Sequence, residues 1–224
     1  MIKKKEKNKI EKNSIFETLA LIVLSFIYII IVRKVDVQNI GPKNSEVGLA
    51  SINSFFHNLL GRNMTIYKIT EILGMIALLI VGVYAVIGLM QLIKGKSLKK
   101  VDSKIISLGI LYVLLGIVYV LFEKVIINYR PVIIDGELEA SFPSSHTMLA
   151  ICICISSIIV NKDYIKNKKY LKLTNIGLLI LMSLIVVGRF VSGVHWFSDI
   201  VGGIIISITL LSCFNVITGI LGEK

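Results

Sequence analysis

The stretch GRFVSGVHWFSD (residues 188–199) places ionisable side chains between two long apolar segments. Within it, His195 and Asp199 stand at positions i and i+4, a spacing that puts two side chains on one face of a helix. A carboxylate that is hydrogen-bonded to one imidazole nitrogen fixes the tautomer of the ring and makes the other nitrogen a better nucleophile or base. Arg189 precedes His195 across an expected turn at Gly193, and a guanidinium is a planar fork that suits phosphate oxygens. The stretch therefore predicts nucleophilic chemistry on a phosphate group.

A second polar stretch, NYRPVIIDGELEASFPSSHT (residues 128–147), ends in PSSH before another apolar segment. Proline suits the first turn of a helix, so PSSH predicts a helix start. A helix N-terminus has unpaired N–H groups and the positive end of the dipole, which together favour an anion. The hydroxyls of Ser144 and Ser145 add donors, and Arg130 adds a second guanidinium. Together with His146 these residues suit phosphoryl transfer, and no cluster of carboxylates in the sequence indicates a metal.

The composition is that of an integral membrane protein. Of the 224 residues 55% are hydrophobic and 17% are charged, whereas a soluble domain carries about 25% charged residues. A helix needs about 20 apolar residues to cross the bilayer core. Six segments approach or reach this length: residues 15–32, 72–93, 105–122, 144–160, 173–191 and 198–217. We therefore expect an all-α fold, an integral membrane bundle of six transmembrane helices in a single domain over residues 1–224. The fourth segment is short and carries hydroxyls, so we expect neighbouring helices to shield it.

Two compositional features argue against other classes of protein. The net charge is +11, but the lysines cluster at the ends of apolar segments, as membrane topology requires, so we expect no nucleic-acid partner. The three cysteines, Cys152, Cys154 and Cys213, all lie inside apolar segments and predict packing residues rather than ligands or disulfides. We therefore expect neither a metal nor another cofactor.

The basic residues predict the orientation in the membrane. Six spans put both termini on one side, and that side carries 17 of the 25 lysines and arginines. The positive-inside rule then places both termini, including the basic tail of residues 1–13, in the cytoplasm. A cleaved signal peptide is an alternative for the first span, but Arg33 and Lys34 follow it where small cleavage-site residues belong, so we expect a retained helix. Both polar stretches then lie at the outer face.

The first outward connection, residues 33–71, contains the stretch SINSFFHNLLGRN. Its apolar residues recur at helical spacing, which predicts a short helix lying in the membrane interface. His57 within it has no charged residue at positions i±3 or i±4, so we interpret it as a polar-face residue.

The two polar stretches bring two of the three histidines and two of the four arginines to one face of the membrane. An arginine at a helix end is often a snorkelling anchor, and a lone histidine can simply cap a helix. All four at one face are better explained by function, because ionisable groups in membrane segments are functional by default. A transporter is a weaker alternative, since it would often show internal repeats or broken helices near the midplane.

The polar stretches and the residues before them resemble the three motifs of the type 2 phosphatidic acid phosphatase family. The family pattern is K-x6-R-P, P-S-G-H and S-R-x5-H-x3-D, and this chain has E-K-x5-R-P, P-S-S-H and G-R-x5-H-x3-D. The motifs cover residues 123–199, and the six-helix layout extends the resemblance to the whole chain. The resemblance implies that His195 attacks phosphorus and forms a phosphohistidine, that Asp199 orients it, and that His146 protonates the leaving oxygen. The phosphate ligands that it implies are Arg130, Arg189 and Ser144.

Three positions depart from the family pattern. Ser145 replaces a glycine and can still present its backbone N–H to phosphate, whereas Gly188 replaces a serine and removes a possible hydroxyl contact. Strict spacing puts Glu123 where the family has lysine, and Lys124 follows one residue later, about 100° around a helix. We expect the long and flexible Lys124 to reach the phosphate, because Glu123 would repel an anion.

The loop between the first two motifs also carries three acidic residues, Asp135, Glu137 and Glu139. We interpret them as a solvated face of the loop. The alternative is that they tune the choice of lipid head group, because they stand close to the predicted site in the sequence.

Sequence and resemblance together predict a metal-independent membrane lipid phosphatase with its site at the outer face. Its partners would be the bilayer and a lipid phosphate or diphosphate whose tails lie between helices. An outward site in a chain rich in Lys, Ile and Asn, a bacterial composition, favours undecaprenyl diphosphate by resemblance. Phosphatidic acid, phosphatidylglycerophosphate and diacylglycerol diphosphate stay open. Two further alternatives are a phosphotransferase with a sugar or lipid acceptor, and a degenerate member that binds phospholipid without turnover.

Overall fold

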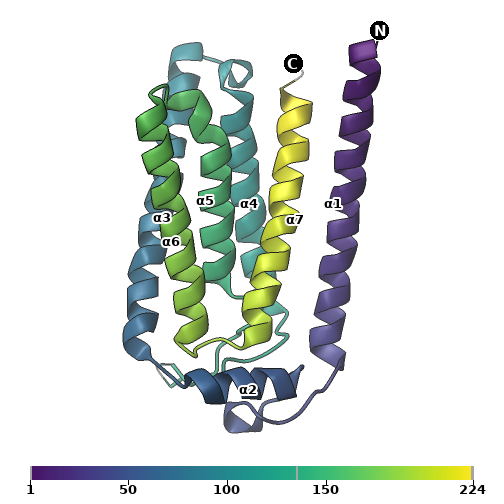
Figure 1. Cartoon of the computed structure of the whole chain (residues 1–224), viewed down its shortest axis with the longest axis vertical. Helices are drawn as coiled ribbons and strands as arrows, with labels where there is room; N and C mark the ends of the chain where they lie inside the picture. Colours follow the sequence, from purple (N-terminus) through teal and green to yellow (C-terminus); the bar gives the residue numbers. More distant parts are fainter. Residues whose placement is uncertain (1, 135, 223–224) are drawn as a thin grey trace.

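The computed structural model describes residues 2–134 and 136–222. The α-helices are α1 (Ile2–Lys34), α2 (Ala50–Leu60), α3 (Met64–Gly95), α4 (Ser103–Lys124), α5 (Ser145–Tyr164), α6 (Lys168–Val191) and α7 (Phe197–Leu221). Two short 3-10 helices are η1 (Pro42–Asn44) and η2 (Leu98–Lys100). All the α-helices except α2 are long and apolar enough to cross a membrane, six in the described residues. Figure 1 shows them as one bundle, with both chain ends at the end opposite α2. The predicted six-helix membrane fold with a short helix after the first span is therefore confirmed.

The second span begins earlier than hydropathy predicts. We expected it to start at residue 72, whereas α3 starts at Met64, where the Asn63 side chain accepts the N–H of Ile66 over 3.0 Å. The additional turns carry Lys68 and Glu71, whose charges interrupt the apolar segment. These charged turns lie at the end of the bundle where α2 lies.

The helices α5 and α7 form the centre of the bundle. Within their spans 56% and 44% of the residues are buried, compared with 28% or less in the other four spans. The span of α5 is also the least apolar of the six, so the prediction that neighbouring helices shield it is confirmed. The main apolar core includes Met148 and Cys152 from α5, Leu111 from α4 and Phe214 from α7. This core sets the N-terminal ends of α5 and α7 side by side.

The first helix packs against α7 with hydroxyl groups as well as apolar side chains. Ser25 Oγ lies 2.8 Å from Thr209 Oγ1, in the buried contact between α1 and α7. Hydrogen bonds of this kind hold helices together in lipid, where apolar surface gains little from packing against protein instead of lipid. Nearer the α2 end, the Tyr28 hydroxyl donates to the carbonyl oxygen of Ser198 over 3.0 Å. The helix α1 therefore supports the first turn of α7.

The short helix α2 lies across one end of the bundle (Figure 1). Its Phe55 is exposed, whereas Phe56 stacks on Phe197 with 4.5 Å between the ring centroids. The fully buried Asn53 accepts the backbone N–H of Ser198 over 3.0 Å and donates to Ser198 Oγ over 2.9 Å. The helix therefore holds the start of α7 from outside the bundle.

The connection between α4 and α5 folds back on itself beside the turn between α6 and α7. Tyr129 and Ala140 form an antiparallel bridge within the connection. The side-chain Nε1 of Trp196 donates to the carbonyl oxygen of Tyr129 over 2.7 Å, and Val132 packs in a small cluster with Val194. These contacts place the arginine–proline pair of the connection next to the HWFSD segment.

The turn between α6 and α7 requires a glycine. Gly193 has a φ of 66°, in the left-handed region, which confirms the predicted turn. A Cβ at this position would also overlap the carbonyl oxygen of Gly61. Beside it, the backbone N–H of Asn63 donates to the carbonyl oxygen of Ser192 over 2.9 Å. The turn therefore packs directly against the segment between α2 and α3.

Replacing Gly193 with alanine is expected to destabilise the protein, because a left-handed backbone costs an L-residue about 1–2 kcal/mol even without an overlap. Gly219→Ala is the matched control, since Gly219 lies in α7 with open space around its Cβ position, and alanine favours a helix by up to about 1 kcal/mol. Thermal unfolding in detergent should show a lower melting temperature for Gly193→Ala than for the wild type. The melting temperature of Gly219→Ala should not be lowered. Equal melting temperatures for the two variants would contradict a glycine-dependent turn.

Candidate active site

His195 lies in the turn between α6 and α7 and is 4% exposed. Its Nδ1 lies 3.1 Å from the carbonyl oxygen of Ser141 and 3.2 Å from Ser141 Oγ. A carbonyl oxygen can only accept a hydrogen bond, so Nδ1 carries the hydrogen and Nε2 keeps a lone pair. Among the described residues Nε2 has no hydrogen-bond partner. The ring is therefore held in the tautomer that presents Nε2 as a nucleophile.

Asp199 supports the histidine in a different way from the one that the spacing predicts. His195 precedes α7, whose N-cap residue is Trp196, so the pair does not stack on one helical face. One carboxylate oxygen of Asp199 accepts the Trp196 backbone N–H over 2.8 Å and the Ser141 hydroxyl, and lies 3.7 Å from His195 Nδ1. The carboxylate thus acts on the imidazole through its charge and through Ser141. The sequence does not distinguish Ser141 from its neighbouring serines, so its place in the site was not predicted.

The Arg189 side chain is fully buried at the end of α6. Its Nη2 donates to Glu71 Oε1, and its guanidinium carbon lies 4.7 Å from the centre of the Tyr67 ring. Tyr67 and Glu71 both lie in α3 before residue 72, where the apolar segment predicted the second span to begin. Within the part of the chain that the structure describes, Nε and Nη1 of Arg189 have no hydrogen-bond partner. A buried guanidinium with unpaired N–H groups is suited to bind an anion.

Arg130 lies opposite Glu139 in the connection between α4 and α5, with Nε 2.9 Å from Glu139 Oε2. Its Nη1 is buried and has no hydrogen-bond partner in residues 2–134 and 136–222. Glu139 therefore forms an ion pair with an arginine of the candidate site, which its interpretation as part of a solvated loop face did not include. Glu137 is exposed, and Asp135 lies outside the described residues.

The start of α5 lies against the start of α7. Ser144 is the N-cap of α5, so the helix begins just after the predicted proline rather than at it. The Ser144 backbone N–H donates to the carbonyl oxygen of Asp199 over 3.0 Å. Gly203 permits this approach, because a Cβ there would lie 3.1 Å from the Ser144 carbonyl oxygen. Ser145 and His146 occupy the first turn and line the cavities next to the site.

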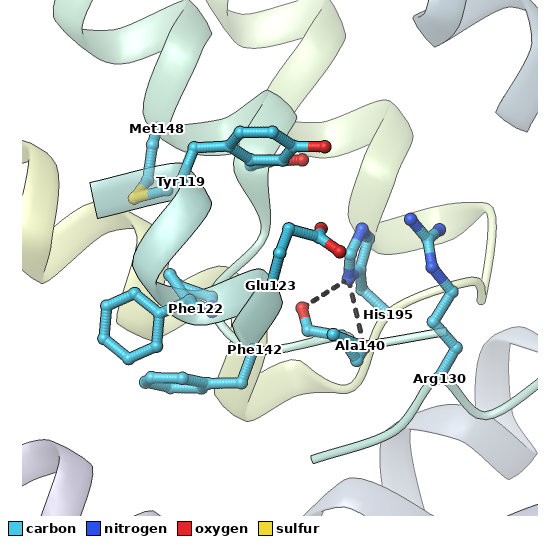
Figure 2. A pocket seen from close by; sticks show the side chains of 11 residues that line it. Tyr119, Phe122, Glu123, Arg130, Ala140, Phe142, Met148 and His195 are labelled. Atoms are coloured by element: carbon cyan, nitrogen blue, oxygen red, sulfur yellow. Dashed lines mark hydrogen bonds between the residues drawn. The ribbon is translucent and has the colours of Figure 1, made fainter. Parts of the chain in front are cut away.

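The helix α4 presents Glu123 rather than Lys124 to the pocket at His195. Glu123 lines this pocket together with Arg130, and Figure 2 shows the Glu123 carboxylate pointing toward the His195 ring. Lys124 is exposed and does not line the pocket. A phosphate contact from Lys124 would need the last turn of α4 to unwind, and it stays a prediction.

The departure from the family pattern at Gly188 follows from helix packing. Gly188 is buried where α6 crosses α3, and a Cβ there would lie 2.5 Å from Thr70 Cγ2. Thr70 is itself buried, so a serine at position 188 would force the two helices apart.

The third histidine lies behind the site. The ring of His57, in α2, lies 5.4 Å from the Trp196 ring between centroids, and burial lowers the pKa of His57 below its usual value. His57 therefore packs against the turn before α7, which its interpretation as a polar-face residue did not include. Residue spacing within α2 does not show that this helix packs on the turn between α6 and α7.

Two acidic side chains of the site lie beside its arginines. Glu71 Oε1 lies near both Arg189 and His146, and Glu139 pairs with Arg130. In the described residues, no group of three or more His, Cys, Asp or Glu side chains could hold a metal ion. The unpaired N–H groups of the arginines point instead to an anion such as phosphate.

Comparisons with known proteins identify the family of the chain. The family model of the PAP2 superfamily matches residues 104–219, more than half of the chain. The chain belongs to the PAP2 superfamily. It is a multi-pass membrane phosphatase of that superfamily, so the predicted resemblance is confirmed.

The fold is similar to that of a PAP2 protein of known structure. This is the crystal structure of a transmembrane PAP2-type phosphatidylglycerolphosphate phosphatase from Bacillus subtilis, with a TM-score of 0.60 and 15% sequence identity. The match covers 89% of this chain and 94% of the Bacillus subtilis chain. No curated protein sequence matches the chain. At this identity the likeness shows that the PAP2 fold is shared.

Burial and the nearby Arg130 and Arg189 hold the pKa of His195 well below its usual value. The unfolded chain therefore takes up a proton on His195 as the pH falls through about 6.5, whereas the folded protein excludes it. The contribution of neutral His195 to the free energy of unfolding is thus fully present above about pH 6.5, and it is lost progressively as the pH falls below that value. His195→Gln removes this titration.

The melting temperature of the wild type should consequently fall more than that of His195→Gln between about pH 7.5 and about pH 5.5. Melting in detergent at a series of pH values checks the difference. Parallel curves for the two proteins would contradict a buried neutral imidazole.

Proposed function

We propose that the protein is a metal-independent lipid phosphatase that works through a phosphohistidine on His195. The observation that carries this proposal is the buried Nε2 of His195, which is held unprotonated by the bond from Nδ1 to Ser141. Arg130 and Arg189 lie beside it with N–H groups that have no partner in the described residues. A phosphate bound by both guanidinium groups would place its phosphorus next to the Nε2 lone pair, and these charges would stabilise the transition state.

The reaction would proceed in two steps. In the first, the Nε2 lone pair forms a bond to phosphorus while the P–O bond to the lipid breaks, and the leaving oxygen takes a proton from His146. In the second, water attacks the phosphohistidine, His146 takes a proton from the water, and the N–P electron pair returns to His195. The products are inorganic phosphate and either the lipid alcohol, from a monophosphate, or the lipid monophosphate, from a diphosphate. His146 therefore acts first as an acid and then as a base, as covalent catalysis requires.

The first turn of α5 would complete the phosphate site. Ser144 and Ser145 stand at the N-terminus of this helix, where unpaired N–H groups and the helix dipole favour an anion. Ser145 lines the pocket at His195. The position of Ser145 supports a phosphate contact, whereas the Ser144 N–H already donates to the Asp199 carbonyl oxygen.

An apolar groove beside the site fits a lipid tail. It has a volume of about 410 Å³ and is lined by residues of α3, α4 and α5. Ser145 and His146 lie at its polar end, and Leu78, Leu115 and Ile153 are among its apolar residues. A largely apolar wall with a few polar groups at one end is typical of a site for an amphipathic ligand. The head group would lie at the site while the tail lies between the helices.

The orientation favours one substrate class. The excess of lysine and arginine at the end that carries both termini supports a cytoplasmic location for the termini and an outward site. An outward site supports undecaprenyl diphosphate, the substrate that the resemblance favours. Phosphatidic acid and phosphatidylglycerophosphate are the alternatives. The Bacillus subtilis protein of similar fold is named as a phosphatidylglycerolphosphate phosphatase.

Two other functions are distinguishable from hydrolysis. The same phosphohistidine could pass its phosphate to a sugar or lipid acceptor. Glu123 favours a second candidate, a protein that binds phospholipid without turnover, because its carboxylate lines the pocket at His195 and would keep phosphate away from the nucleophile. The intact His146, His195 and Asp199 support hydrolysis over this candidate.

Phosphate release in detergent, from undecaprenyl diphosphate and from phosphatidic acid with a chelator present, tests the proposal. His195→Ala should lose at least about 10³-fold in rate, because it removes the nucleophile. His57→Gln is the matched histidine control and should keep most of the activity. Release only in the presence of an acceptor would favour a phosphotransferase, and no release by the folded wild type would favour lipid binding without turnover.

Two neighbouring variants test the residue that faces the phosphate from α4. Lys124→Ala should raise KM by about 10-fold if its ammonium contacts phosphate, since a hydrogen bond to a charged group contributes about 1.5–3 kcal/mol. Glu123→Gln removes a negative charge from the pocket and should lower KM. Steady-state kinetics of the two variants measure both effects. Full activity of Lys124→Ala would exclude a phosphate role for Lys124.

A further inference from the structure

The side of α3 that faces the site carries four residues at helical spacing. They are Tyr67, Thr70, Glu71 and Gly74. Tyr67 lies against Arg189, and the missing side chain of Gly74 makes room for His146, whose Cδ2 would lie 2.7 Å from a Cβ there. These residues precede the part of the chain that the family model matches, residues 104–219, so the match assigns no role to them. The helix α3 therefore supplies a fourth segment of the site in addition to the three motifs.

Glu71 lies between two residues of the site. Its Oε1 accepts a hydrogen bond from Arg189 Nη2 and lies 3.4 Å from His146 Nε2. The Glu71 side chain is 41% exposed, whereas the His146 side chain is 26% exposed and that of Arg189 is fully buried. One carboxylate oxygen is thus shared by the guanidinium that would hold phosphate and the imidazole that would move a proton.

The other charged groups around His146 are basic. Arg189, which shares Glu71 Oε1 with His146, comes from α6, whereas Arg130 and His195 come from the connection between α4 and α5 and from the turn before α7. Positive groups disfavour a further positive charge, whereas a neighbouring carboxylate favours it. A general acid must carry a proton before it can donate one. His146 therefore needs a negative charge beside it, and Glu71 is in place to supply it.

We propose that Glu71 is a positioning residue of the reaction, which orients His146 and whose charge favours the protonated imidazole from which the leaving lipid oxygen takes its proton. The inference rests on the proposed phosphatase function and deepens it. When a phosphate binds to the Arg189 N–H groups that have no partner in the described residues, Glu71 keeps its contact with His146. The proton then passes from His146 to the leaving oxygen as the P–O bond breaks. It is replaced from the attacking water in the second step, so Glu71 itself neither gains nor loses a proton.

The leaving group of the substrate separates this role from a structural one. A lipid alkoxide needs a proton to leave, whereas p-nitrophenolate leaves without one. The test measures kcat/KM, which includes the steps up to the phosphohistidine, for two phosphate monoesters. They are p-nitrophenyl phosphate and the lipid monophosphate that the wild type hydrolyses fastest. Glu71→Gln keeps the size of the side chain and removes its charge, and Glu71→Asp keeps the charge. Glu46→Gln is the matched control, because Glu46 is exposed in the connection before α2.

We expect Glu71→Gln to lower kcat/KM for the lipid by at least about 10-fold, part of the 10²–10⁴-fold that general acid catalysis contributes. The fall for p-nitrophenyl phosphate should be less than about 3-fold. The descending limb of the pH profile for the lipid should move to lower pH in the glutamine variant. Glu71→Asp should recover part of the loss, and Glu46→Gln should match the wild type.

An equal fall for both substrates would overturn the proposal and leave Glu71 with a structural role. A rise in kcat/KM for both would also overturn it, because Glu71 would then only compete with phosphate for Arg189. Should Glu71→Gln fail to fold, as judged by its melting temperature, Glu71→Ala, which also removes the charge, decides: an unchanged ratio between the substrates and an unchanged pH profile overturn the proposal. A wild type that hydrolyses neither these monoesters nor undecaprenyl diphosphate would instead overturn the proposed function itself.

Discussion

The Asp199 carboxylate is the constraint on which the site depends. It is fully buried in the first turn of α7, where it accepts the Trp196 backbone N–H and the Ser141 hydroxyl. The backbone carbonyl of the same residue accepts the N–H of Ser144. A buried carboxylate without these donors would be strongly destabilising. One residue therefore joins the connection before α5, the start of α5 and the start of α7, and His195 lies where these segments meet.

The same principle governs the buried charge on α6. A guanidinium within a membrane bundle is costly unless it is paired, and Arg189 is paired with Glu71 and lies against the Tyr67 ring. The pairing requires α3 and α6 to approach closely, which the missing side chain of Gly188 permits next to Thr70. Stability and phosphate binding thus depend on the same contacts.

The bundle could be predicted from the sequence because its signals are local. Apolar segments of membrane length predict the six spans, helical spacing predicts α2, and Gly193 predicts the turn before His195. The residues that tune the site could not be predicted in this way. Ser141 reaches the site only because the connection between α4 and α5 folds against the turn between α6 and α7. Glu71 interrupts an apolar segment, so its charge suggested a loop, whereas it lies in a helix with the charge turned toward a buried arginine.

The departures from the family pattern also needed the structure. Position 123 presents a carboxylate to the pocket, and only the rotation of α4 shows that Lys124 does not line it. The spacing of His195 and Asp199 suggested a shared helical face, but α7 begins between them, and the carboxylate turns back to the N-cap. Motif spacing therefore identified the residues of the predicted site, while their mutual geometry depended on where each helix begins.

The most direct test of the account is a structure of the wild-type protein with orthovanadate, which adopts the five-coordinate geometry of phosphoryl transfer. The account predicts a bond between vanadium and Nε2 of His195, with vanadate oxygens on Arg130 and Arg189. Glu71 should have kept its contact with His146. Vanadate held by the arginines without a bond to His195, or bound elsewhere in the bundle, would contradict a phosphohistidine mechanism.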